Sequence, residues 1–184
     1  MTDTRTEHDL IELAERGAAE LVDASADELL RWTDEHFGGD YIVASNMQDA
    51  VLVDLAAKVR PGVDVLFLDT GYHFVETVGT RDAVEAVYDV NVVNVRPTHT
   101  VAEQDALHGK DLFARDASAC CGMRKVEPLG KALRNYSAWV TGIRRVEAPT
   151  RANAPLISWD KAFGLVKINP LAAWSDDDMQ NYID

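Results

Sequence analysis

The chain has 184 residues, of which 47% are hydrophobic and 27% are charged, and its formal net charge is −13. This length and composition predict a folded domain with a substantial core and argue against intrinsic disorder. The negative charge argues against nucleic acid as a partner, because a phosphate backbone is bound by a basic protein surface.

The sequence also indicates where the protein works. No apolar run approaches 18 residues, so we expect no membrane span. The acidic N-terminal stretch MTDTRTEHDL has none of the parts of a signal peptide. The only cysteines, Cys120 and Cys121, cannot form a disulfide framework. We therefore expect a protein of the reducing cytoplasm.

Apolar periodicity predicts helices first and then an alternation of strands and helices. Ser25 and Glu28 have the spacing of a capping box at the start of the second helix. We expect helices at 8–22, from Ser25, at 48–59, at 75–90, within 100–134 and from Ser175, and strands at 40–45, 64–70, 91–95, 137–143, 156–160 and 165–171, with an irregular basic loop at 144–155.

This alternation predicts the fold class. Strand–helix–strand units have right-handed crossovers and produce a parallel sheet that is covered on both faces. We therefore expect a doubly wound α/β fold with a mostly parallel sheet. Residues 1–39 are predicted to be an N-terminal helical segment and residues 40–184 a ligand-binding α/β domain, within a single domain overall.

Two loops should lie beyond the carboxyl ends of strands, where such sheets bind ligands. The stretch SNMQD (45–49) offers a hydroxyl, backbone amides and a helix N-terminus, which suit phosphate or sulfate, although it lacks the glycines of a Walker loop. In LDTGYHFVET (68–77), Asp69 and Thr70 close a strand and Gly71 permits a sharp turn or a close ligand approach. Read alone, either loop could also be an ordinary capped turn.

Positive charge is concentrated in one part of this acidic chain. Between residues 124 and 151 there are seven basic residues and only two acidic ones, Glu127 and Glu147. The pattern favours a pocket for a small anion, and the alternative is a solvated helix face followed by a charged loop. The basic residues are Arg124, Lys125, Lys131, Arg134, Arg144, Arg145 and Arg151.

The adjacent Cys120 and Cys121 allow three interpretations. A disulfide between neighbours is strained and rare in the cytosol, and two buried structural thiols are the commonest alternative. Metal ligation is the third, and the cations Arg124 and Lys125 would favour the thiolate form. A tetrahedral site or an iron–sulfur cluster needs about four soft ligands. The missing pair would have to lie beyond Asp184 or come from another subunit.

Four motifs together resemble the sulfonucleotide reductases, which reduce adenylyl sulfate (APS) or its 3′-phosphorylated form (PAPS). SNMQDAVLVDLA is similar to their modified PP-loop and LDTGYHFVET to their second substrate loop, CCGMRKVEPLGKAL resembles their cysteine-pair signature, and GIRRVEAPTRANAP resembles their arginine-rich loop. The order and spacing of the four motifs agree with those of the family from about Tyr41 onward. The residues within the motifs are most similar to those of the actinobacterial members that reduce APS.

The resemblance implies an adenine nucleotide α-hydrolase-like (PP-loop) fold. It also implies thioredoxin-dependent reduction of APS to sulfite and AMP, in sulfate assimilation and cysteine biosynthesis. In this reaction a cysteine thiolate attacks the sulfur and expels the nucleotide, and thioredoxin then releases sulfite. Members of the family are often multimeric, so a homo-oligomer is possible.

The resemblance also assigns residues. Cys120 and Cys121 would be half of the ligands of a [4Fe–4S] cluster, and Lys125 would lie between the cluster and the sulfate, in a supporting catalytic role. Two further cysteine ligands and the nucleophilic cysteine are expected beyond Asp184, so we expect a truncated core that is inactive alone. The expected substrate-binding residues are Ser45, Asn46, Met47, Asp49, Asp69, Thr70, Gly71, Arg124, Lys125, Arg144, Arg145 and Arg151.

Other functions stay open from the sequence. They are a PAPS reductase, a PP-loop nucleotidyl transferase or ATP pyrophosphatase, and a non-catalytic iron–sulfur or nucleotide sensor. The PP-loop enzymes usually carry a glycine-rich loop, which residues 45–49 lack. We expect APS to be preferred to PAPS, because the sulfate, the α-phosphate and the surroundings of the cluster could use all the basic residues that can be placed, which leaves none for the 3′-phosphate.

Overall fold

The sheet of the protein has six strands in the order β3-β2-β1-β4-β6-β5, in a computed structural model that describes residues 4–184. All neighbouring strands pair in parallel except β5, which is antiparallel to β6. The mostly parallel α/β sheet that the sequence predicts is therefore confirmed. The strands are β1 (Tyr41–Ala44), β2 (Val63–Leu68), β3 (Val90–Val95), β4 (Ala138–Thr141), β5 (Ile157–Asp160) and β6 (Leu165–Ile168).

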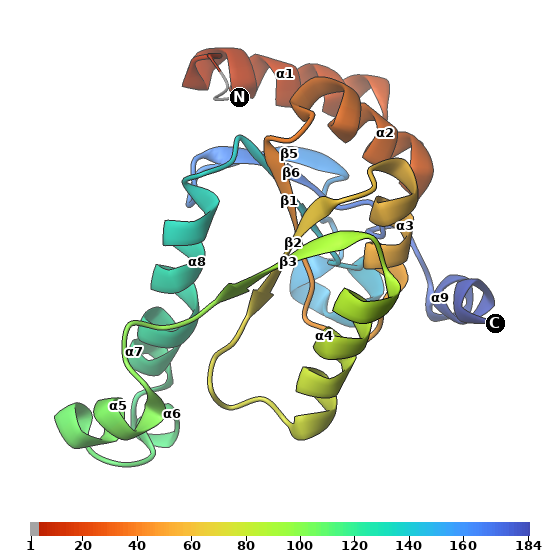
Figure 1. Cartoon of the computed structure of the whole chain (residues 1–184). Helices are drawn as coiled ribbons and strands as arrows, with labels where there is room; N and C mark the ends of the chain where they lie inside the picture. Colours follow the sequence, from red (N-terminus) through yellow and green to blue (C-terminus); the bar gives the residue numbers. More distant parts are fainter. Residues whose placement is uncertain (1–3) are drawn as a thin grey trace.

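Helices lie on both sides of this sheet. Figure 1 shows α8 on one side and α3 and α4 on the other, with α1 above β5 and β6 and with α9 at the outer edge beside α3. The helices are α1 (Glu7–Glu20), α2 (Ala26–Phe37), α3 (Val51–Val59), α4 (Val75–Val87), α5 (Val101–His108), α6 (Leu112–Arg115), α7 (Ala117–Cys121), α8 (Glu127–Leu133) and α9 (Asp176–Ile183).

The two faces of the sheet bury two apolar clusters. Successive residues of a strand point to opposite faces, so Val43 joins the larger cluster with α1, α2 and α3, whereas Ile42 joins the smaller one beneath α8. Ile42 and Val43 are both fully buried. This burial on both sides explains why the strands appear in the sequence as short continuous apolar runs.

The predicted capping box at the start of α2 is confirmed. The amide of Glu28 donates to Ser25 Oγ at 3.2 Å, and the amide of Ser25 donates to Glu28 Oε2 at 2.7 Å. The hydrogen bonds from Ser25 hold the pKa of the Glu28 carboxyl below its ordinary value. The same reciprocal pair, Ser175 and Asp178, begins α9.

Local side-chain contacts shift one expected boundary. The helix predicted at 48–59 begins only at Val51, because one side-chain amide oxygen and one carboxylate oxygen accept hydrogen bonds from backbone amides at and before its start. Asn46 Oδ1 accepts from the amide of Gln48 at 3.0 Å, and Asp49 Oδ1 accepts from the amide of Val51 at 3.0 Å. Residues 45–50 therefore form a loop of short turns.

Two other regions are more structured than the sequence indicates. The basic loop at 144–155 contains two 3-10 turns, Arg145–Glu147 and Pro149–Arg151. The helical region at 100–134 is divided into α5, α6, α7 and α8, with a π-helical turn at Gly122–Val126. Among residues 4–184, no helix has both the length and the apolarity that a membrane crossing requires.

We predict opposite stability effects for alanine at two helical glycines. A Cβ at Gly17 in α1 would lie 2.6 Å from the Trp32 ring and 3.1 Å from Ile157 Cδ1, so Gly17→Ala should destabilise the fold by about 1–3 kcal/mol. A Cβ at the exposed Gly79 in α4 would meet nothing within 4 Å, so Gly79→Ala should stabilise it by about 0.5–1 kcal/mol. Urea unfolding measures both changes, and a stable Gly17→Ala variant would contradict this packing.

Candidate functional site

The first candidate cavity lies where the strand order reverses. The chain runs from β1 to β2 on one side, whereas β4 pairs with the other side of β1, so a crevice opens beyond the carboxyl ends of β1 and β4. We call this space, about 180 Å³ in volume, the switch-point cavity. Its lining includes Ser45, Asn46 and Asp49 from the loop after β1, and Arg144, Glu147 and Arg151 from the loop after β4.

Met47 anchors the loop after β1. Its side chain is fully buried in the larger apolar cluster, and its backbone is left-handed, with φ at 58°. Its amide donates to Ser45 Oγ at 3.1 Å. The Met47 side chain therefore faces the core, and the predicted role of Met47 in substrate binding would have to come from its backbone.

The arginine-rich loop after β4 (residues 142–155), called the arginine loop below, forms ion pairs with carboxylates. Arg144 Nη1 lies 2.8 Å from Asp176 Oδ1 at the start of α9, and Arg144 and Arg151 both pair with Glu147. Arg145 does not line the switch-point cavity, and its Nε donates to the carbonyl of Ala154 at 2.9 Å. Arg144 and Arg151 thus face the cavity, whereas Arg145 braces the loop from within.

A second cavity, of about 600 Å³, brings the second loop and the cysteine pair together. We call it the thiol cavity. Cys120 is buried and Cys121 is exposed. The cavity is lined by Thr70, Tyr72, His73, Phe113, Ala117, Cys120, Cys121, Arg124 and Lys125.

The π-helical turn places the neighbouring side chains of Arg124 and Lys125 in different environments. It begins at Gly122, directly after Cys121, and such turns recur at functional sites. Arg124 is only 3% exposed, whereas Lys125 is exposed. Among residues 4–184, Lys125 has no ion-pair or hydrogen-bond partner, so its charge is available to a ligand in the thiol cavity.

Arg124 connects three parts of the chain. Its Nε donates to the carbonyl of Thr70 at 2.5 Å, and its Nη1 donates to the carbonyl of His99 and to Gln104 Oε1, each at 3.1 Å. A Cβ at Gly71, where φ is 80°, would lie 3.0 Å from Arg124 Nη2, so both backbone and space favour glycine. Most of the donors of Arg124 therefore hold protein groups, and its predicted role as an anion ligand stays a prediction that rests on Nη2.

Gln104 is the functional candidate that sequence reasoning missed. It is 1% exposed, and its Nε2 lies 3.8 Å from Cys120 Sγ. The residue pattern of α5 gives no signal for this burial, because Gln104 is the only buried residue of the helix while the apolar Leu107 is exposed.

The loop after β2 has partners of its own. Asp69 Oδ1 accepts from the amide of Gly71 at 3.1 Å, and Asp69 Oδ2 lies 3.3 Å from Arg96 Nε. The hydroxyl of Thr70, which is buried, accepts from the amide of Tyr72. Desolvation raises the pKa of the Tyr72 phenol, with a smaller electrostatic contribution from Cys120.

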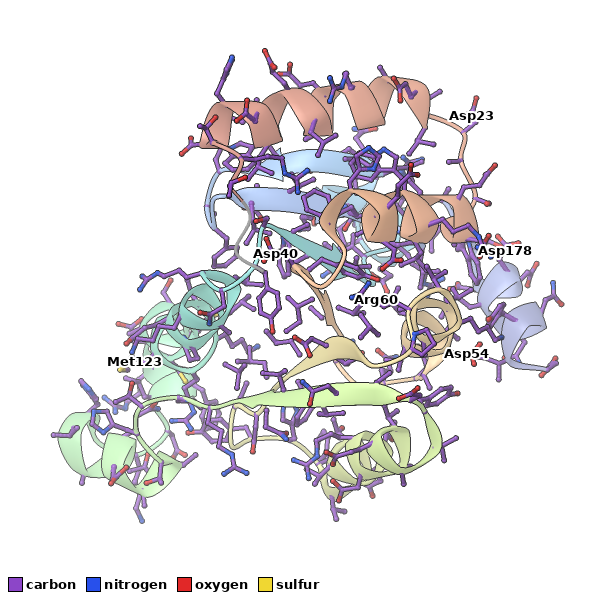
Figure 2. All side chains as sticks on the ribbon, turned by 45° about the horizontal axis from the view of Figure 1, so that its top comes forward. Asp23, Asp40, Asp54, Arg60, Met123 and Asp178 are labelled. Atoms are coloured by element: carbon purple, nitrogen blue, oxygen red, sulfur yellow. The ribbon has the colours of Figure 1, made fainter. Side chains whose placement is uncertain are left out.

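The predicted site residues thus divide between two cavities. The switch-point cavity gathers Ser45, Asn46, Asp49, Arg144 and Arg151, and the thiol cavity gathers Thr70, Cys120, Cys121, Arg124 and Lys125. Met47, Asp69, Gly71 and Arg145 line neither of the two. Figure 2 shows Met123, the residue before Arg124, on one side of the sheet, and Asp54 in α3 and Asp178 in α9 on the other side.

Comparison with known proteins decides the family. A family model described as phosphoadenosine phosphosulfate reductase domain matches residues 41–184. The chain belongs to this family. The resemblance to the sulfonucleotide reductases is confirmed, and the match begins at Tyr41, where the motif order in the sequence also began.

Curated relatives and solved structures agree with this family. Proteins named adenosine 5'-phosphosulfate reductase are 81% identical in Mycolicibacterium smegmatis, over 100% of this chain and 79% of the relative, and 67% identical in Mycobacterium tuberculosis, over 97% and 77%. The phosphate complex of the PAPS reductase from Candida auris has a TM-score of 0.77 and 25% identity, and the match covers 100% of this chain and 88% of that one. FMN adenylyltransferase from Candida glabrata, 13% identical over 96% of this chain and 65% of that one, has a TM-score of 0.58 and shares the fold alone.

Proposed function

We propose that this chain binds APS and forms the nucleotide-binding core of an enzyme that reduces APS to sulfite and AMP. The observation that carries the proposal is the identity of 67–81% to proteins named for that substrate, over at least 97% of this chain. The two cavities support it, because Arg144 and Arg151 line the first, together with Asp49 and Glu147, and Arg124 and Lys125 line the second.

The nucleotide phosphate is assigned to the switch-point cavity. Helix α3 has no side-chain cap at its N-cap, Ala50, and Asp49 accepts only from the amide of Val51, so the next amides of the first turn, those of Leu52 and Val53, are left for a ligand. Arg144 and Arg151 line the opposite wall. Together, the helix N-terminus and two guanidinium groups would neutralise the phosphate that leaves as AMP.

In APS the sulfate and this phosphate share one bridging oxygen, so the proposal requires the switch-point cavity and the thiol cavity to adjoin. The sulfate is then assigned to the thiol cavity beside Lys125. An anionic thiolate approaches a sulfate only when nearby cations neutralise it, and Lys125 is a cation exposed in that cavity. In the reaction a thiolate forms a bond to sulfur while the bond from sulfur to the phosphate oxygen breaks. Two electrons from the thioredoxin dithiol then reduce the resulting S-sulfocysteine and release sulfite.

The cysteine pair supports a [4Fe–4S] cluster in part. Two adjacent thiols border a large cavity, which suits soft-metal ligation, but four ligands are needed. Among residues 4–184, no group of three or more His, Cys, Asp and Glu side chains is placed to hold a metal ion. We assign the other two thiolates, and the nucleophile, to residues outside this chain. When bound, the cluster would add its electrostatic influence beside Lys125.

Calorimetric titration with APS, PAPS, AMP and ATP tests the proposed function. We expect APS to bind more tightly than PAPS, because the only arginines and lysines of residues 4–184 that line the two cavities are Arg124, Lys125, Arg144 and Arg151, and these are assigned to the sulfate, the α-phosphate and contacts within the protein. ATP should bind more weakly than APS. Tighter binding of PAPS would favour the PAPS reductase alternative, and tighter binding of ATP would favour a PP-loop nucleotidyl transferase.

We predict that Asp176→Asn tightens APS binding by about two- to fivefold. Asp176 is exposed and pairs with Arg144 Nη1, so its removal frees that nitrogen for the ligand while Glu147 still pairs with Arg144, and an exposed ion pair is worth about 0.2–1 kcal/mol. Asp177→Asn is the matched control, since Asp177 lies on the same turn of α9 and has no ion pair among residues 4–184. Equal changes from the two variants would show a general charge effect and contradict competition for Arg144.

A further inference from the structure

Gln104 stands between the buried arginine and the buried thiol. Its Oε1 accepts from Arg124 Nη1 at 3.1 Å, and its Nε2 donates to Cys120 Sγ at 3.8 Å. All three residues are almost completely buried, with exposures of 1% for Gln104, 3% for Arg124 and 6% for Cys120. The contact spans three segments of the chain, namely helix α5, helix α7 and the π-helical turn.

The chemistry of the neighbours fixes the orientation of this amide. A guanidinium has donors only, so the carbonyl oxygen of Gln104 must face Arg124. The amino group of Gln104 is then directed at sulfur. In the opposite orientation two donors would face each other, and the buried Oε1 would lose its charge-assisted hydrogen bond.

The arginine is itself immobilised. Its other hydrogen bonds hold the carbonyls of Thr70 and His99, which belong to the loops after β2 and β3. A continuous set of buried contacts therefore leads from these loops through Arg124 and Gln104 to one of the two thiols. Cys121, the neighbouring thiol, is exposed and has no such contact among residues 4–184.

We propose that Gln104 is a positioning residue that fixes the side chain of Cys120 and links it to the loops at Thr70 and His99. The two thiols then differ in how firmly they are placed. The sulfur of Cys120 is fixed before any metal binds, and the side chain of Cys121 takes its position when the metal binds. This inference concerns contacts within the chain and holds whichever nucleotide the switch-point cavity binds.

A double-mutant cycle in urea unfolding tests the contact. Gln104→Leu combined with Cys120→Ala should show coupling of about threefold or more in the unfolding equilibrium constant, because the contacting pair is non-additive. Gln104→Leu with Cys121→Ala is the matched control and should be additive. Additivity for both cysteines, or equal coupling to both, would overturn the proposal.

Two further measurements separate positioning from general support of the fold. The side-chain amide signals of Gln104 in ¹⁵N–¹H NMR should shift in Cys120→Ala and stay in place in Cys121→Ala, a test that needs no substitution at Gln104. Gln104→Glu keeps the acceptor for Arg124 and loses the donor to sulfur, so it should regain most of the stability lost in Gln104→Leu.

Cd²⁺ alone provides a direct probe of the thiol pair. Under anaerobic conditions, the ultraviolet sulfur-to-cadmium absorption should show at least threefold weaker Cd²⁺ binding in Gln104→Leu than in the wild type. The same substitution at the exposed Gln180 should leave Cd²⁺ binding unchanged. Unchanged amide signals in Cys120→Ala together with unchanged Cd²⁺ affinity in Gln104→Leu would show that Gln104 does not position the sulfur.

Discussion

Replacing Lys125 by alanine should weaken APS binding by about tenfold or more, whereas Lys131→Ala should leave it almost unchanged. Lys125 is exposed in the thiol cavity and has no protein partner among residues 4–184, so all of its charge is available to the sulfate. A charge-assisted contact is worth about 1.5–3 kcal/mol, and about 1.4 kcal/mol corresponds to a factor of ten. Lys131 is paired with Glu127 at 2.9 Å and lies outside the cavity.

Titration of APS against the wild type and the two variants measures this difference. Thermal melting should show that both variants remain folded, because both side chains are exposed. Lys125→Arg keeps the charge and should retain more affinity than Lys125→Ala. Equal losses from Lys125→Ala and Lys131→Ala would mean that the sulfate does not lie in the thiol cavity.

Replacing the neighbouring Arg124 by alanine should instead destabilise the fold, by about 3 kcal/mol or more. Arg124 is buried, and its loss leaves the carbonyls of Thr70 and His99 and the side chain of Gln104 without their donors. Each buried acceptor left unsatisfied costs about 1–3 kcal/mol, which applies to the Thr70 carbonyl and Gln104 Oε1, whereas the partly buried carbonyl of His99 costs less. Arg124→Lys should restore little of this stability, because one ammonium group cannot reproduce a fork of donors.

Urea unfolding of Arg124→Ala and Arg134→Ala tests the contrast between a buried and an exposed arginine. Arg134 is exposed and has no ion pair among residues 4–184, so its removal should change stability by less than about 0.5 kcal/mol. If Arg124→Ala unfolds like the wild type and only loses affinity for APS, then Arg124 acts mainly as the anion ligand that the sequence predicts.

The sheet and its coverage could be predicted because they follow from local patterns. Short apolar runs between helical spacings indicate buried parallel strands, and Ser25 and Glu28 mark the start of a helix by their spacing alone. The start of α3 could not be predicted so well. Asn46 and Asp49 take the backbone amides that would otherwise lie at the beginning of the helix, and apolar periodicity does not report this competition.

The different roles of Arg124 and Lys125 also could not be predicted from a single sequence. Both residues carry one positive charge, and the π-helical turn that separates their directions leaves no pattern in the residue types. Two of the acceptors of Arg124 are backbone carbonyls 25 and 54 residues away in the chain, at His99 and Thr70. Only the arrangement of the sheet brings those carbonyls beside the arginine.

Charge counting overestimated the free positive charge of the arginine loop for a related reason. Glu147 was visible within the basic segment, but it pairs with Arg144 and with Arg151. Asp176 lies 32 residues after Arg144 and reaches it through the position of α9. A local excess of basic residues therefore indicated where an anion could bind, and the packing decided which guanidinium groups are occupied by carboxylates.

The loop after β1 has a thermodynamic consequence for ligand binding. Its turns are fixed by hydrogen bonds from the amides of Met47, Gln48 and Val51 to side chains of the same loop. Most of its conformational entropy is therefore lost when the chain folds, before any nucleotide arrives. Binding should order the loop little further, so amide hydrogen exchange at Met47, Gln48 and Val51 should already be slow in the free protein and should change little with ligand.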